Sequence, residues 1–240
     1  MRLHARQFCH KPSDEAAFTL LELLAVVAIL ALLMALCLPS LAEARKSAGR
    51  AACQSTLSQW AKAVIMYADA NYAYLPRRGQ GAQPTVVIDR PEDWFNALPP
   101  LMKTTAYRDL VSAQHMPQPG QSSLYMCPQA LNAGDGFFFA YAMNMRLSTW
   151  NAAKPDRIDR VAPPAVQVFM ADGPGNYCSA LPSKEAYSPV ARHLGRVKIS
   201  FLDGHVNSFP EAYVGCRMGD PRHGDVQWIV PGSSWPGPIE

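Results

Sequence analysis

A run of sixteen consecutive apolar residues, Leu23 to Leu38, constrains this chain of 240 residues more than any other feature. Together with the segment Phe18–Leu21 before it, the run reaches about the 20 residues that a helix needs to cross a bilayer. One charged residue, Glu22, lies inside this stretch. Because a carboxylate in a membrane helix costs about 2.5–3.5 kcal/mol on insertion scales, Glu22 requires a functional explanation.

The rest of the composition indicates a globular domain attached to this segment. The chain is long enough for one domain of ordinary size and an appendage. Its 21 prolines indicate long ordered loops. The formal net charge is +3 and scattered, which does not indicate a nucleic-acid partner.

Three ordinary interpretations of the apolar segment compete. A secretory signal peptide would have a basic start and a small-residue cleavage site, for which Ala42-Glu43-Ala44 is available, but its apolar core is usually only 7–15 residues. A lipoprotein anchor at Cys37 fits less well, because the bulky Leu36 precedes that cysteine. A plain uncleaved anchor remains open, and none of the three explains Glu22.

A fourth interpretation explains the charge. The sequence Ala-Phe-Thr-Leu-Leu-Glu-Leu-Leu over residues 17–24 resembles the signal of type IV pilins and type II secretion pseudopilins. In that family a prepilin peptidase cuts before the Phe and the new amine is methylated. A cut before Phe18 would make Glu22 the fifth and Pro39 the twenty-second mature residue, where the family carries those residue types. Ala17 departs from the usual Gly before the cut.

The resemblance implies a specific role for Glu22. An unpaired carboxylate is costly in lipid, whereas a paired one is tolerable. We expect the charged amine of a neighbouring Phe18 to pair with Glu22 when subunits assemble.

Beyond Pro39 the spacing of apolar residues predicts that the helix continues, with one polar and one apolar face. One helix is expected from Phe18 to Asn71, kinked near Pro39. Trp60 and Tyr67 are expected to be core anchors. The apolar positions recur every three or four residues: Leu57, Trp60, Ala61, Val64, Tyr67 and Ala68.

The remaining sequence predicts strands and loops. The segments 86–88, 137–141 and 165–170 are β-prone, and a helix start is expected at 91–94. Residues 196–202 and 205–209 predict a hairpin with a type I′ turn at Asp203-Gly204. The expected fold class is α+β, a long N-terminal helix packed on a small antiparallel sheet.

His193, nine intervening residues and then Asp203-Gly204 resemble the H-x9-DG motif of a large group of pilin-like proteins that share this N-terminal helix. Together with Asp172 and His205, these side chains could converge on a zinc-like divalent metal ion, the one cofactor that the sequence leaves open. The simpler alternative is that Asp203-Gly204 is only a turn, with His193 hydrogen-bonded across it.

Other titratable groups give weaker signals. Related pseudopilins bind calcium near their C-terminus, where Asp220 and Asp225 lie here, although no defensible ligand spacing connects them. His115 and His223 are expected to be surface residues.

Four cysteines remain if Cys9 leaves with the leader and Cys37 stays in the apolar helix: Cys53, Cys127, Cys178 and Cys216. An exported domain favours disulfides, and four cysteines allow three connectivities. The pairs Cys53–Cys127 and Cys178–Cys216 are favoured, with buried free thiols as the alternative.

The sequence thus predicts a cleavable leader (1–17), a membrane helix (18–38), its extramembrane half (39–72) and an exported α+β domain (73–240). We expect a single-pass protein of the inner membrane that prepilin peptidase processes. It would assemble with identical or related subunits into a pilus or secretion pseudopilus and would not be an enzyme. The alternatives are a tethered binding module, or an anchored metal-binding protein or metallohydrolase using His193, Asp203 and His205.

Overall fold

A computed structural model describes residues 19–79, 85–131, 137–148, 156–161, 163–182, 185–215 and 223–228. The chain divides into two compact units, Met1–Arg45 and Lys46–Glu240. The helices are α1 (Leu20–Ala70), α2 (Trp94–Ala97), α3 (Tyr107–Ser112) and α4 (Glu211–Val214). The strands are β1 (Phe139–Asn144), β2 (Val168–Gly175), β3 (Ser179–Ala180), β4 (Arg196–Phe201) and β5 (Val206–Pro210), and short 3-10 turns occupy Pro99–Met102, Met145–Leu147, Ile158–Arg160 and Glu185–Tyr187.

Helix α1 runs unbroken for 51 residues and continues through Pro39. This confirms the expected long helix, whereas its expected kink near Pro39 stays a prediction and Phe18 lies outside the described residues. In the first unit every described side chain, from Thr19 to Arg45, is exposed. By length and composition the helix is apolar enough to cross a membrane. Leu, Ala and Met dominate this part, and all three are strong helix formers.

In the second unit, α1 buries one face, and the predicted periodicity is confirmed there. Gly49, Cys53, Leu57, Trp60, Ala61, Ala63, Val64 and Ala68 are its buried residues. The indole N–H of Trp60 donates to the Leu124 carbonyl at 2.9 Å, so this fully buried side chain leaves no polar atom unpaired. Its ring meets the edge of Trp94 at 5.0 Å between centroids. Tyr67 lies half-buried at the edge of the same core.

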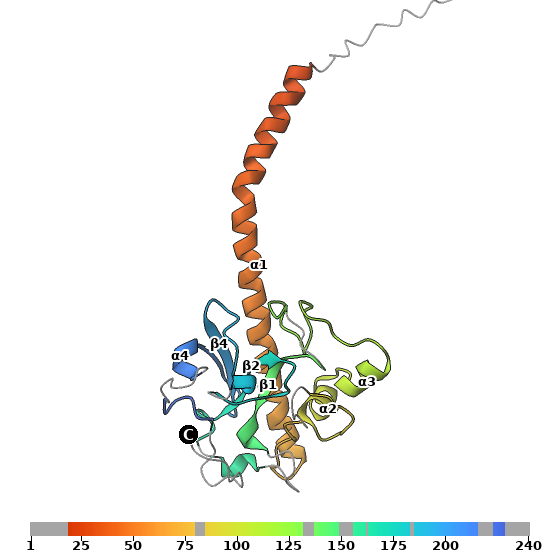
Figure 1. The fold of residues 1–240 in the computed structure, drawn as a ribbon, viewed down its shortest axis with the longest axis vertical. Coiled ribbons are helices and arrows are strands. Elements are labelled where there is room, and N and C mark those ends of the chain that lie inside the picture. The colour runs from red at the N-terminus through yellow and green to blue at the C-terminus, as the bar shows by residue number, and fades with distance from the viewer. Residues whose placement is uncertain are drawn as a thin grey trace, which may run out of the picture. The chain divides into compact units, whose positions relative to one another are not determined.

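The five strands form one sheet in the order β3-β1-β2-β4-β5. All neighbouring pairs are antiparallel except β1 and β3, which are parallel. Figure 1 shows α2 and α3 to one side of strands β1 and β2, and α4 beside β4 on the other. The fold is therefore α+β, as the sequence predicted.

Each face of the sheet covers its own apolar cluster. Phe139, Tyr141 and Phe169 point toward α1 and join the cluster around Trp60. Val197 and Ile199 point the other way and pack with Trp228. Because side chains of a strand alternate between faces, the residues of β4 that alternate with these apolar ones, Lys198 and Ser200, face α1.

Two strand predictions need correction. Residues 85–90 contain no strand, so the β-prone segment 86–88 is irregular chain. Strand β2 begins at Val168, three residues later than expected, because Val166 N–H closes a turn onto the Pro163 carbonyl. The strand then extends through Gly173, where an added Cβ would lie 2.8 Å from the Ala142 Cβ, so only glycine permits this approach of β1 and β2.

The hairpin of β4 and β5 is present, but its turn is not type I′. That turn requires a positive φ at both central residues, and of the pair Asp203-Gly204 only Gly204, at 98°, has one. The backbone of Phe201 pairs with His205 across a three-residue loop, in which glycine takes the left-handed position. Consecutive positive φ angles, as in a type I′ turn, occur instead at Leu194 (56°) and Gly195 (73°) before β4, and at Tyr72 (55°) and Ala73 (67°) after α1.

Removing the Trp60 side chain tests this architecture. Trp60→Ala should lower the free energy of unfolding by about 3–5 kcal/mol, the usual cost of truncating a buried aromatic residue. Met66→Ala, on the exposed side of the same helix, should change it by less than about 1 kcal/mol. Urea unfolding of the full chain in detergent, followed by far-UV circular dichroism, measures both. Equal losses would contradict the packing described here.

Candidate functional site

The first turn of α1 explains how the segment around Glu22 folds. The Glu22 carboxylate accepts hydrogen bonds from the Thr19 backbone N–H at 2.9 Å and from the Thr19 hydroxyl at 2.8 Å. The Glu22 backbone N–H in turn lies 3.2 Å from the Thr19 hydroxyl oxygen. This reciprocal arrangement is a capping box, which satisfies N–H groups that have no partner in a helix start. Within one chain, Glu22 therefore defines where α1 begins.

The other residues of the predicted processing site are only partly covered by the structure. Ala17 and Phe18 lie outside the described residues. Pro39 lies inside α1, with the neighbouring Ser40 hydroxyl donating to the Cys37 carbonyl at 2.8 Å. The cleavage itself and its position remain predictions.

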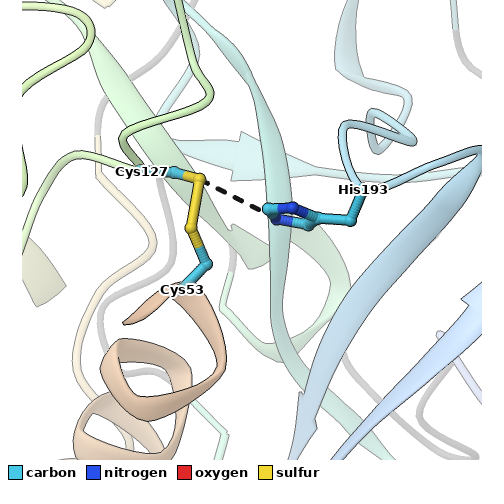
Figure 2. Close-up of side chains that lie close together, drawn as sticks. All are labelled: Cys53, Cys127 and His193. Carbon is cyan, nitrogen blue, oxygen red and sulfur yellow. Dashed lines mark hydrogen bonds between the residues drawn. A yellow bond between two sulfur atoms is a disulfide. The ribbon is translucent and has the colours of Figure 1, made fainter. Parts of the chain in front are cut away.

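A buried group of reactive side chains lies between α1 and the sheet. Cys53 of α1 forms a disulfide with Cys127, which lies 74 residues later in a loop. The imidazole of His193 sits beside this bond, with its Nε2 atom 3.8 Å from the Cys127 sulfur (Figure 2). All three residues are buried. We call them the Cys-Cys-His cluster.

His193 reaches this position because of the turn that follows it. His193 and Arg196 exchange backbone hydrogen bonds of 3.3 Å across Leu194-Gly195, so the chain reverses there and enters β4. The imidazole points inward, where its Nδ1 lies 2.6 Å from the Gln129 amide oxygen. Its Nε2 lies 3.5 Å from an oxygen of Asp172 in β2. The hydrogen bonding expected at the hairpin entrance is thus made by the backbone, and across a different turn.

The four side chains considered for a metal site separate into two pairs. Asp172 and His193 are buried together, whereas Asp203 and His205 form an exposed pair 2.6 Å apart in the hairpin loop. The His205 ring also stacks on Phe201 at 4.2 Å. Among the described residues, the group of three candidate ligands close enough to share an ion is the Cys-Cys-His cluster, which contains one residue of the H-x9-DG motif.

Asp172 is the centre of a polar row across the sheet. It pairs with Tyr141 of β1 and accepts the backbone N–H of Lys198 in β4 at 2.8 Å. Burial lowers the pKa of Lys198, and the Asp172 carboxylate offsets part of that shift. The Lys198 ammonium donates to Gln54 of α1 at 3.2 Å. Burial also lowers the pKa of Arg192, again against the attraction of Asp172. Two cations thus lie in the field of one buried carboxylate.

The cysteines follow the predicted pattern in part. The favoured Cys53–Cys127 pair is present as a disulfide. The favoured Cys178–Cys216 pair is wrong for this structure, in which Cys178 is a free thiol, and Cys216 lies outside the described residues. Cys178 is fully buried, its carbonyl accepting from the Trp94 indole and its N–H donating to Thr85. These contacts hold it inside the core.

The described residues give no support for the suggested calcium site at Asp220 and Asp225. Asp220 lies outside them, and both oxygens of Asp225 lie 2.8 Å from the Tyr213 hydroxyl. His223 has a partner that the sequence did not reveal, because its ring stacks on Tyr213 at 3.7 Å. His115 is exposed, as expected.

Sequence reasoning missed two residues of this polar group, Gln129 beside His193 and Lys198 beside Asp172. Gln129 lies in a loop with no motif around it, and Lys198 appeared only as one position of an alternating strand. A charged residue at an alternate position of an otherwise apolar strand is the one signal that could have marked Lys198.

Residues 12–38 match the family model of the prokaryotic N-terminal methylation motif. The chain carries a prepilin-type signal. This supports a pilin-like or pseudopilin family and processing by prepilin peptidase. With the apolar part of α1, the signal indicates membrane anchoring with an exported domain. No curated protein and no solved structure matches the chain.

The Cys53–Cys127 disulfide closes a long loop and should stabilise the second unit accordingly. Chain-entropy reasoning for a separation of 74 residues gives about 4 kcal/mol. Cys53→Ala with Cys127→Ala should lower the free energy of unfolding by that order, whereas Cys37→Ala, in the exposed part of α1, should leave it unchanged. Urea titration of the full chain in detergent measures both. A double variant as stable as the wild type would contradict this account.

Cys178 should make stability depend on pH in the alkaline range. Burial raises the pKa of this thiol from 9.0 to about 11. Between these values the native state keeps the proton while the unfolded chain loses it, so stability is complete below pH 9 and falls as pH rises toward 11. From pH 8 to pH 10 the wild type should lose about 1 kcal/mol more than Cys178→Ala. The free energy of unfolding of both proteins is measured in urea at a series of pH values. If the two pH profiles coincided, the prediction would be wrong.

Proposed function

We propose that this protein is a structural subunit of a filament of the type IV pilus or type II secretion pseudopilus kind. The observation that carries the proposal is the combination at the start of α1. A prepilin-type signal matches over residues 12–38, and the apolar helix that it opens carries one carboxylate in its first turn. The chain would be a substrate of prepilin peptidase and not itself a catalyst.

The proposal gives Glu22 two successive roles. In the single chain its carboxylate is stabilised by the two hydrogen bonds that it accepts from Thr19. In a filament, the methylated amine of a neighbouring Phe18 would replace solvent as its partner. Because a charge in lipid is costly unless paired, a subunit in the wrong register would be penalised. The exposed apolar residues from Leu20 to Leu41 would pack against the same segment of other subunits.

The chain would reside in the inner membrane as a single-pass precursor. Its leader, residues 1–17, would be removed and its C-terminal domain would lie outside the cytoplasm. The disulfide between Cys53 and Cys127 supports this placement, since disulfides persist in oxidising compartments.

The alternatives draw less support from the geometry. A metallohydrolase built on His193, Asp203 and His205 needs these side chains together, but His193 is buried beside Asp172 while Asp203 and His205 form an exposed pair. A tethered binding module needs only an anchor, and it would leave the charge at position 22 without a role in assembly.

The substitution Glu22→Gln separates capping from charge. Glutamine serves equally at the third position of a capping box, so the variant keeps α1 and membrane insertion but loses the ion pair. We expect at least a tenfold loss of filaments in the native host. Glu22→Ala, which removes both functions, should be no better assembled than Glu22→Gln. Filaments are counted by electron microscopy and immunoblots of sheared fractions.

The control is the mass and N-terminal sequence of the membrane-bound protein. Both variants should begin at methylated Phe18, which shows that processing and assembly have been separated. Wild-type filament yield from Glu22→Gln would overturn the ion-pair role and leave Glu22 as a helix cap. A wild-type chain that begins at Arg45 or at Met1 would overturn the filament proposal itself.

A further inference from the structure

The Cys-Cys-His cluster has the composition of a metal site, and reduction of its disulfide would free both sulfurs as ligands. The sulfur atoms of Cys53 and Cys127 and a ring nitrogen of His193 all lie within 4.8 Å of one another, and all three residues are buried. Thiolate sulfur and imidazole nitrogen are the ligands that zinc takes in structural sites. A zinc tetrahedron with its usual bond lengths places neighbouring donor atoms roughly 3.3–3.8 Å apart. The observed separation of Nε2 and the Cys127 sulfur is 3.8 Å.

The hydrogen bonds of Gln129 fix the tautomer that such a site needs. The side-chain amide N–H of Gln129 donates to the Lys46 carbonyl at 3.0 Å, which leaves its oxygen facing His193. That oxygen can only accept, so the Nδ1 atom of His193 carries a proton. In that tautomer the lone pair is on Nε2, the nitrogen beside the sulfur. A histidine ligand held through its second nitrogen in this way is the usual arrangement in metal sites.

Asp172 of the sheet lies outside the group whose donor atoms are all within 4.8 Å of one another, but it is next to His193 and would serve as a fourth ligand once the sulfurs separate. Its Oδ2 atom lies 3.5 Å from Nε2 of His193, within the range expected for neighbouring ligands of one zinc ion. Its Oδ1 atom is buried and has no hydrogen-bond partner among the described residues. A buried carboxylate oxygen without a partner is costly, and a cation bound to the Asp172 carboxylate would offset that cost.

The disulfide decides whether these ligands are available. In the oxidised chain the two sulfurs share a bond and carry no charge for a cation. A phosphine or dithiol reductant delivers two electrons and, with two protons, the bond becomes two thiols while the reductant is oxidised. Zinc then displaces both thiol protons, leaving a centre of two thiolates, one imidazole and one carboxylate. Its formal charge of −1 would lie near two cations, the buried Lys198 and the partly buried Arg192, which both lie in the field of Asp172.

We propose that the reduced chain binds one zinc ion through Cys53, Cys127, His193 and Asp172, and that disulfide formation and zinc binding are mutually exclusive. The site would hold α1 to the sheet before oxidation, as the disulfide does after it. This inference concerns the second unit alone and does not rest on filament assembly.

Zinc binding to the full chain in detergent tests the proposal. The background chain carries Cys9→Ser, Cys37→Ser, Cys178→Ala and Cys216→Ser, so that only the pair remains. After phosphine reduction and gel filtration it should retain one zinc per chain, whereas the oxidised chain should retain none. Cobalt in place of zinc should give the visible bands of a tetrahedral site and a thiolate charge-transfer band in the near ultraviolet. Competition with a chromogenic chelator gives the affinity.

Matched variants identify the ligands. His193→Asn and Asp172→Asn should each weaken zinc binding by at least roughly tenfold, and Cys53→Ser with Cys127→Ser should abolish it. His205→Asn, from the exposed pair, should bind as the background chain does. Far-UV circular dichroism controls for folding: if reduction alone unfolds the second unit, zinc should restore it.

Four results would overturn the proposal. The first is a reduced chain that is folded but retains no zinc, and the second is a reduced, unfolded chain that zinc does not refold. The third and fourth are the oxidised chain or the double serine variant retaining as much zinc as the reduced background chain. Each leaves the filament proposal untouched, since that depends on Glu22 and on processing before Phe18.

Discussion

Burial of one face of α1, from Gly49 to Ala68, is the interaction on which the second unit depends. The main apolar cluster forms around this face, with Trp60 and Trp94 at its centre. In proteins most of the stability of a helix comes from packing of its apolar face rather than from helix propensity. The same backbone carries an exposed apolar surface in the first unit, so one continuous helix serves two different surroundings.

A polar interior accompanies this apolar packing. Asp172 and His193 are buried at 0% and 2% exposure, between α1 and the strands that it covers. Charged groups are tolerated there because Lys198 and Arg192 compensate the charge of the Asp172 carboxylate. Gln129 orients the imidazole of His193. The disulfide lies at the edge of this group (Figure 2). Removing one partner would leave another uncompensated, so the group acts as a unit.

The sequence was sufficient where a local pattern determines structure. The apolar run and the three- and four-residue periodicity predicted α1, and alternation predicted β4 and β5. It failed where a tertiary contact decides. The type I′ turn was assigned to Asp203-Gly204 from composition, whereas consecutive positive φ angles occur at Leu194-Gly195, where the backbones of His193 and Arg196 pair. A leucine at φ 56° has no local preference for that turn.

The disulfide also determines how the chain would carry load. Tension applied to α1 and to the strands beyond Cys127 passes through the sulfur–sulfur bond and bypasses the polypeptide between the two cysteines. Those residues, which include α2 and α3, could not be drawn out while the bond persists. An oxidised subunit would thus be shorter at full extension than a reduced one by about 250 Å, from the length of an extended chain of 74 residues. Oxidation makes the second unit far less extensible.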